Sequence, residues 1–143
     1  MRFAIRKTTS LVTAAALGVV SMSAFAANRS VTVGAGGGLT FSPPTLSISA
    51  GDTVTFTYAG GAAPHNVRSD PTAVTQFRCA NGCDGVGSGN GNPTSAGWTA
   101  TIAFPTLGSV PYYCEIHGGP GGQGMAGSIT VTTPVEIQSF EVD

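Results

Sequence analysis

The chain has 143 residues, a formal net charge of −1 and only 9% charged residues. Three of its six basic residues precede position 8, so the part after residue 26 has three arginines and seven acids, a balance of 3 − 7 = −4. This balance argues against nucleic acid as a partner, because nucleic acid selects basic patches. The length after residue 26 suits one domain with its own core.

The first 26 residues show the pattern of a secretory signal peptide. Basic residues at positions 2, 6 and 7 precede a short apolar stretch at 11–20, and small residues at 24 and 26 suit a cleavage site. A membrane anchor is the alternative, but Thr13 and Gly18 interrupt a stretch that falls short of the ~20 apolar residues a spanning helix needs. We therefore expect cleavage after Ala26 and an exported protein without stable membrane insertion, in the periplasm or, second, the medium. The predicted domain covers 27–133, with a C-terminal extension at 134–143.

The chain after the signal peptide is predicted to be all-β. Alternating apolar and polar residues, the period of a half-buried strand, occur at 31–33, 46–48, 53–58 and 128–132, and further candidate strands lie at 99–104 and 110–114. Pro111 indicates that the strand at 110–114 begins there or lies at a sheet edge. Turns rich in Gly and Pro separate these segments, and no helical period is evident. The pattern predicts a Greek-key β-sandwich, with Trp98 and Phe104 in its core.

Two segments lack a clear strand pattern. Residues 81–97 are dominated by Gly, Asn, Ser, Pro and Asp, which predicts a long loop. The tail at 134–143 alternates only weakly, so an added edge strand and a frayed end both stay open.

The number of cysteines is odd, which calls for an explanation in an exported protein. Cys79 and Cys83 are four residues apart and could close a small disulfide loop. Three free thiols are the alternative, but an oxidising compartment favours the disulfide. Cys114 would then be the free thiol.

The free thiol belongs to a set of metal-binding residue types. Beyond the signal peptide the chain has two histidines and one methionine, which with Cys114 make four residues. Three of the four, Cys114, His117 and Met125, lie within twelve positions, and the fourth is His65. Two His and one Cys in a trigonal plane with a long axial Met hold copper as a one-electron site. Zinc is the alternative metal, although methionine is a poor zinc ligand. We expect one copper per chain, with Cys114 at the end of a strand and His117 in the loop beyond it.

Three sequence motifs carry a family resemblance. They are Pro64-His65-Asn66, Tyr113-Cys114-x-x-His117 and Gly124-Met125-x-Gly127-x-Ile129-x-Val131. With them the chain resembles the cupredoxins of the plastocyanin, pseudoazurin and amicyanin type over about residues 30–133. The resemblance implies a β-sandwich with a type 1 (blue) copper that shuttles electrons between redox proteins.

The same resemblance assigns roles to individual residues. His65, Cys114 and His117 would be the equatorial ligands and Met125 the axial one, while Asn66 would steady the cysteine loop by hydrogen bonding. The exposed edge of His117 would pass electrons to a transiently docked cytochrome or copper enzyme.

The sequence also departs from the family pattern. Seven residues separate His117 from Met125, where the plastocyanin type has four, and Ile116 stands where proline is common. The pair Cys79 and Cys83 is not part of that pattern.

Two other functions are weighed against electron transfer by a monomeric carrier. A copper-delivery protein could use the same ligand set but would release its copper. A copper enzyme would need further histidines, and the chain has no third one, so we expect no enzyme. Glu115, beside the cysteine, is expected to be a solvated rim residue.

Overall fold

The computed structural model describes residues 26–134, so most of the predicted signal peptide and of the C-terminal extension lie outside the described residues. The described part is built almost entirely of strands, with one 3₁₀ turn at Ala35–Gly37. The strands are β1 (Asn28–Val33), β2 (Phe41–Ser42), β3 (Thr45–Ser49), β4 (Thr53–Tyr58), β5 (Val67–Ser69), β6 (Arg78–Ala80), β7 (Gly82–Cys83), β8 (Trp98–Ala103), β9 (Gly108–Gly119) and β10 (Gln123–Thr132).

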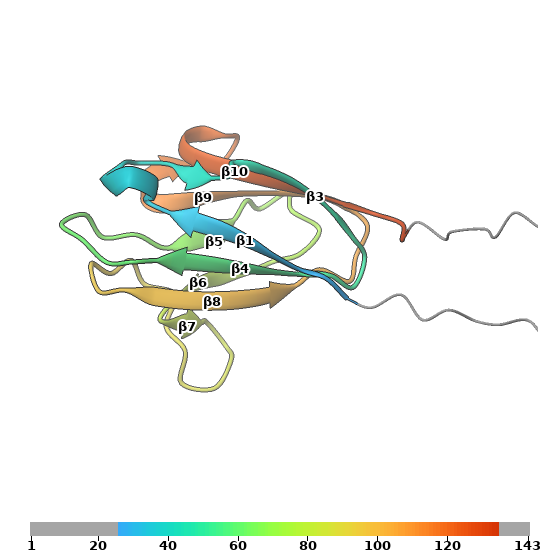
Figure 1. Ribbon diagram of the computed structural model, residues 1–143, viewed down its shortest axis with the longest axis horizontal. Helices are drawn as coiled ribbons and strands as arrows, with labels where there is room; N and C mark the ends of the chain where they lie inside the picture. Colours follow the sequence, from blue (N-terminus) through green and yellow to red (C-terminus); the bar gives the residue numbers. More distant parts are fainter. Residues whose placement is uncertain (1–25, 135–143) are drawn as a thin grey trace, which may run out of the picture.

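The strands form two sheets that face each other (Figure 1). One has the order β2-β1-β4-β8, and the other has the order β3-β10-β9-β5-β6-β7. Parallel pairing of β1 with β4 and of β3 with β10 joins segments that are distant in sequence, and most other pairs are antiparallel. The predicted all-β sandwich is therefore confirmed.

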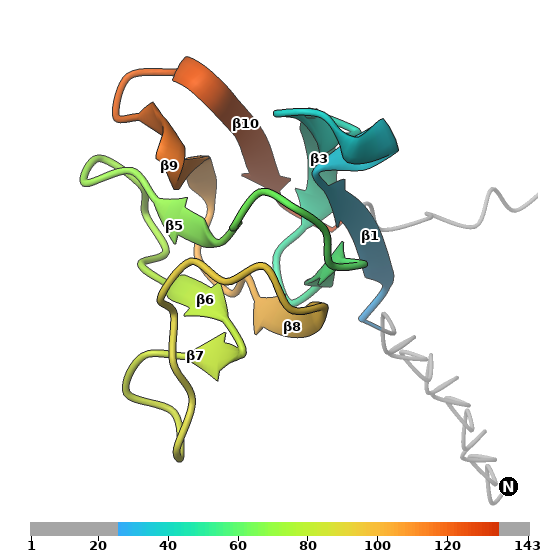
Figure 2. The same ribbon diagram turned by 90° about the vertical axis from the view of Figure 1, so that its left-hand side faces the viewer.

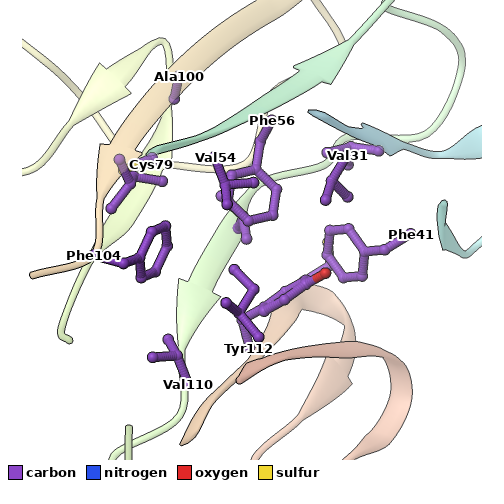
Figure 3. Close-up of a cluster of buried hydrophobic side chains, with 14 of the residues drawn as sticks. Val31, Phe41, Val54, Phe56, Cys79, Ala100, Phe104, Val110 and Tyr112 are labelled. Atoms are coloured by element: carbon purple, nitrogen blue, oxygen red, sulfur yellow. The ribbon is translucent and has the colours of Figure 1, made fainter. Parts of the chain in front are cut away.

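The core lies between the sheets and is centred on an aromatic cluster. The ring of Tyr112 on β9 meets Phe41 and Phe56 of the other sheet edge-on, at centroid distances of 4.9 and 5.2 Å (Figure 3). The predicted core residues Trp98 and Phe104 are buried, at 6% and 0% exposure. Edge-to-face contacts of this kind add to the stabilisation from burial, because the positive edge of one ring meets the negative face of another.

One strand prediction was wrong. Pro111 was expected at a strand start or a sheet edge, but it lies inside β9, which runs between β10 and β5. The proline is tolerated because its carbonyl accepts the backbone N–H of Asp70, just past the end of β5. Its ring nitrogen faces the same side, where no neighbouring strand needs a donor.

The predicted loop at 81–97 is more ordered than its composition indicates. It contains β7, and isolated bridges join Asn81 to Asn90 and His65 to Thr94. Figure 2 shows β5, β6 and β7 in succession at one side of the sheet. These strands have only two or three residues each, too few to show a period in the sequence. Within residues 26–134, no helix is long and apolar enough to cross a membrane.

Gly127 on β10 offers a test of the sandwich packing. A Cβ at this position would lie 2.5 Å from the Tyr112 side chain and 2.7 Å from the Pro44 carbonyl oxygen, so Gly127→Ala would displace the Tyr112 ring from its place in the core or shift the backbone at Pro44. We expect a loss of about 1–3 kcal/mol in the free energy of unfolding, measured with urea. Gly119→Ala is the control, because its Cβ would meet nothing within 4 Å. Equal stabilities of the two variants would contradict this view of the packing.

Candidate metal centre

Three of the four predicted ligands meet at one end of the sandwich. The Cys114 Sγ atom lies 3.7 Å from His65 Nδ1 and 3.5 Å from His117 Nδ1. One ligand atom from each residue lies within 4.8 Å of the others, and the two imidazole centroids are 4.7 Å apart. His65 and Cys114 are buried, whereas His117 is half-buried. His117 is therefore the most exposed of the three predicted ligands.

The spacing of these donors fits a metal ion. Bonds of about 2.0 Å to nitrogen and 2.3 Å to sulfur that meet at roughly 110–120° would separate the two donor atoms by about 3.5–3.7 Å. The two observed sulfur–nitrogen distances, 3.7 and 3.5 Å, lie in this range. The mixture of soft thiolate and borderline imidazole suits copper. The three side chains could thus coordinate one copper ion with little rearrangement.

His65 is held from several sides. Its backbone pairs with Thr94 through N–H···O bonds of 3.0 and 3.1 Å, and its carbonyl also accepts the Trp98 indole N–H at 3.1 Å. The Tyr58 ring meets the imidazole edge-on at 4.9 Å. A Cβ on Gly34 would lie 3.1 Å from His65 Nε2, so only glycine leaves the ring this room without displacement. Burial, and secondarily the neighbouring His117, lowers the pKa of His65, which favours the neutral imidazole that a metal needs.

The second half of the site is a β-hairpin, which corrects one prediction. Cys114 was expected to end a strand, but β9 continues to Gly119 and pairs with β10 beyond the ligands. The pairing jumps from Gly124↔Gly118 to Ala126↔Tyr113. The segment 114–117 of β9 therefore bulges opposite the single residue Met125 of β10, and Met125 is only 2% exposed. The bulge thus places Met125 opposite the segment that contains Cys114 and His117.

The extra residues between His117 and Met125 extend this hairpin. Gly118 and Gly119 pair with Gly124 and Gln123, and the tip turns through Pro120-Gly121-Gly122. Gly124 has φ +64°, and a Cβ there would overlap the His117 carbonyl oxygen. Only glycine combines this backbone angle with such close strands. The longer ligand segment is thus a regular extension of two paired strands.

The tip of the hairpin is tied to the connection after β5. The Gly121 N–H donates to Asp70 Oδ2 at 2.8 Å, and the other carboxylate oxygen accepts two bonds from Thr72. These bonds, first from the Thr72 backbone and then from Gly121, hold the pKa of the Asp70 carboxyl below its usual value. Sequence reasoning missed this contact, because the two residues are 51 positions apart.

Asn66 connects the two halves of the site. Its Oδ1 accepts the Glu115 backbone N–H at 3.0 Å, and its Nδ2 donates to the Gly91 carbonyl at 2.9 Å and to Glu115 Oε2 at 2.6 Å. All three bonds come from a side chain with 0% exposure. Because Asn66 follows His65 and Glu115 follows Cys114, these bonds hold the two ligand-bearing segments together.

Glu115 differs from the expectation of a solvated rim residue. Its carboxylate accepts Arg68 Nη1–H at 2.6 Å and Arg78 Nε–H at 2.7 Å, and its side chain is 19% exposed. Burial alone would raise the pKa of Glu115, but the hydrogen bonds from Arg68, Arg78 and Asn66 outweigh it and lower the pKa. No spacing in the sequence indicates that these side chains meet.

The cysteines are arranged as their number predicts. Cys79 and Cys83 form a disulfide between β6 and β7, and Cys114 is the free cysteine of the described residues. The disulfide closes the start of the segment 81–97 beside Arg78. It therefore shapes the chain next to the arginine that contacts Glu115.

Comparison with known proteins identifies the class to which this fold and donor set belong. The family model for copper binding proteins of the plastocyanin/azurin family matches residues 27–132. Chloroplastic plastocyanin of Hordeum vulgare is 35% identical over 128 residues, which cover 88% of this chain and 77% of that protein. Chloroplastic plastocyanin of Tetradesmus obliquus is 38% identical over 113 residues, covering 78% and 71%. A solved mutant plastocyanin of fern is 28% identical with a TM-score of 0.50, covering 73% of this chain and all of that one.

The chain therefore belongs to the plastocyanin/azurin family of copper-binding proteins, and it is a cupredoxin. The resemblance predicted from the motifs is confirmed. With a His, Cys and His cluster in a cupredoxin sandwich, it is a blue copper electron-transfer protein with one copper site.

Asp70→Asn tests the tie between the hairpin tip and the body of the protein. An asparagine amide has only one acceptor oxygen, whereas the carboxylate has two, so either Gly121 or Thr72 loses its acceptor. We expect a lower urea midpoint at pH 7 and faster hydrogen exchange at the Gly121 amide.

The pH dependence gives a second readout of the same substitution. Because the folded pKa of Asp70 is below its usual 3.8, its carboxylate contributes stability above that pH and loses it as the pH falls through the folded pKa. The difference between wild type and variant should shrink towards pH 3. A difference independent of pH, or unchanged Gly121 exchange, would contradict the tie.

Proposed function

We propose that this cupredoxin is a soluble, exported carrier that takes an electron from one redox protein and passes it to another, cycling Cu(II) and Cu(I). The observation that carries the proposal is the meeting of Cys114 Sγ with His65 and His117 Nδ1 at 3.7 and 3.5 Å. In such a site copper would supply a one-electron couple, because the mixed sulfur and nitrogen ligands accommodate both Cu(II) and Cu(I).

The chain's part is to keep the donor atoms in one place. We assign His65, Cys114 and His117 as equatorial ligands and Met125 as the axial ligand. Support comes from the burial of Met125 and from the bulge that places it opposite 114–117. Donors fixed by strands and hydrogen bonds need little movement when the charge of the site changes, so electron exchange is fast.

Partners would dock at the surface around His117. This ligand is half-buried, and beside it Ile116 is 56% exposed. Leu39, 52% exposed, follows the turn after Gly34, where an added Cβ would lie 3.1 Å from His65 Nε2. An exposed apolar surface beside a ligand suits brief docking of a cytochrome or a copper enzyme by a monomeric carrier, because transient redox encounters bury little area.

An enzymatic role has less support. The copper nitrite reductase of Thermus scotoductus shares the fold, with a TM-score of 0.53 and 22% identity, but this chain covers only 25% of it. The chain has two histidines in total, and both belong to the one cluster. Nothing remains in the sequence for a second histidine-rich copper centre.

Copper delivery is the second candidate, because the ligand set serves either task. The carrier is favoured because His65 is buried and because both its backbone N–H and its carbonyl are hydrogen-bonded to Thr94. A delivery protein must release copper to its target, whereas a carrier retains it. Two measurements on the copper-loaded protein separate these functions: the rate at which a Cu(I) chelator removes the copper, and the rate of electron exchange with cytochromes. Slow copper loss with fast electron exchange fits a carrier, whereas fast copper loss with slow electron exchange fits delivery.

Copper titration of residues 27–143 tests the site itself. We expect intense blue absorption that saturates at one copper per chain, since thiolate-to-Cu(II) charge transfer is strong. Ascorbate should bleach the colour and an oxidant should restore it. Cys114→Ala should abolish the colour, while Arg29→Gln, an exposed residue on β1, should keep it. A pale colour that survives Cys114→Ala would refute the type 1 site.

We further propose that residues 1–26 are a signal peptide and that the exported protein begins at Ala27. Support comes from the Ala27 N–H, which donates to Asp52 Oδ1 at 2.8 Å. Asp52 is 6% exposed and also accepts the Ser49 N–H at 2.9 Å. Cleavage after Ala26 would turn the Ala27 nitrogen into an ammonium group beside a carboxylate. Export would thereby add an ion pair that the precursor lacks.

A comparison of the exported chain with its Nα-acetylated form tests this ion pair. The protein recovered from the periplasm should have the mass of residues 27–143. At pH 6.5 acetylation should lower stability by up to about 1 kcal/mol. The pair raises the pKa of the amine, so its contribution is complete below the unfolded value of about 7.7–8.0 and is lost as the pH rises through the folded pKa. Asp52→Asn should cancel the effect of acetylation. A different N-terminus, or an equal effect of acetylation in Asp52→Asn, would contradict the assignment.

A further inference from the structure

A cluster of charged side chains surrounds the residue that follows the copper cysteine. The Glu115 carboxylate accepts bonds from three side chains: Arg68 on β5 at 2.6 Å, Arg78 on β6 at 2.7 Å, and Asn66, just before β5, at 2.6 Å. Only three arginines occur after residue 26, and two of them contact this one carboxylate. In a chain with 9% charged residues, such a concentration needs a physical reason.

Glu115 is bonded to Asn66 at two points. Its backbone N–H donates to Asn66 Oδ1, and its carboxylate accepts from Asn66 Nδ2. Two bonds between the same residues fix orientation as well as distance. Since His65 and Cys114 are the chain neighbours of this pair, any rotation of Asn66 would displace the two buried ligands relative to each other.

The arginines make this arrangement electrostatically tolerable. A carboxylate one residue from a copper thiolate would repel it and favour the higher positive charge of Cu(II). Arg68 and Arg78 offset that charge, and Arg78 is itself held by Asp84 at 2.9 Å and Asn92 at 2.8 Å. The Arg68 and Arg78 side chains are 45% and 26% exposed, so solvent screens their charges only partly.

We infer that Glu115 is a positioning residue, and that its cluster with Arg68 and Arg78 sets both the spacing of His65 and Cys114 and the reduction potential of the copper. This inference rests on the proposed copper-carrier function. It assigns the potential to charges on β5 and β6 rather than to the ligands alone.

The sign of each substitution follows from the charge of the site, which is one unit lower with Cu(I) than with Cu(II). Glu115→Gln removes one negative charge near the copper site, so the reduced form gains and the potential rises. Arg68→Gln removes one positive charge from the cluster, so the oxidised form gains and the potential falls. At a fixed solution potential, the ratio of reduced to oxidised protein should change by roughly three- to tenfold in each case. The double variant should return close to the wild-type potential.

Redox titration of the four copper-loaded proteins tests these signs, with Arg29→Gln as the control for loss of one exposed arginine. Arg29 is the second residue of β1, whereas Gly34, on which an added Cβ would lie 3.1 Å from His65 Nε2, follows the far end of that strand. The control should shift the potential far less than Arg68→Gln. Equal shifts in the two, or an unchanged potential in Glu115→Gln, would overturn the inference.

The metal-free protein gives an independent readout of positioning. In Glu115→Ala the Asn66 side-chain amide loses one acceptor, so its hydrogen exchange should accelerate while amides of β1 and β8 keep their protection. Unchanged Asn66 exchange would overturn the positioning role. A wild-type protein that takes up no copper as a blue site would refute the proposed function, whereas blue wild-type and variant proteins with equal potentials would refute only the cluster's role.

Discussion

The metal centre depends on holding donors from two distant parts of the chain at a fixed separation. His65 and Cys114 are 49 positions apart, and their side-chain atoms must stay within 3.7 Å. A flexible chain would lose much conformational entropy in bringing them together. Here the fold has already borne this cost, because β5 pairs with β9 and brings the segment after β4 alongside the ligand strand. Asn66 then completes the connection with two hydrogen bonds to Glu115.

Much of the site could be predicted because its chemistry is carried by rare residue types. After residue 26 the chain has two histidines, one methionine and one cysteine outside the predicted disulfide, which left almost no choice of ligands. The longer strands could also be predicted, because apolar and polar residues in β4 and β10 alternate with the two-residue period of a strand. Such signals are local in sequence. They can be recognised without any knowledge of which segments become neighbours in the fold.

What could not be predicted is mostly the result of long-range pairing. Pro111 argued against a central strand, but β5 ends just where its missing donor would have been needed. Glu115 looked like a rim residue because nothing near it in sequence could neutralise it. Its partner Arg68 lies 47 positions away and arrives through the pairing of β5 with β9. A charged residue can be called solvated from sequence only when its spatial neighbours are known.

The long ligand segment shows why three added residues need not disturb the copper site. A flexible insertion between His117 and Met125 would enlarge the set of positions open to the methionine. An insertion into both arms of a hairpin does not, because paired strands keep their separation of about 5 Å however far the tip is moved. Gly118 and Gly124 pair directly beyond His117 and Met125, so the backbone position of Met125 is fixed before the extra residues begin. The tip is then free to acquire another contact, and its bond to Asp70 places that contact on the strand connection that follows Asn66 and Arg68. Both ligand-bearing segments are consequently anchored to the same stretch of chain around β5.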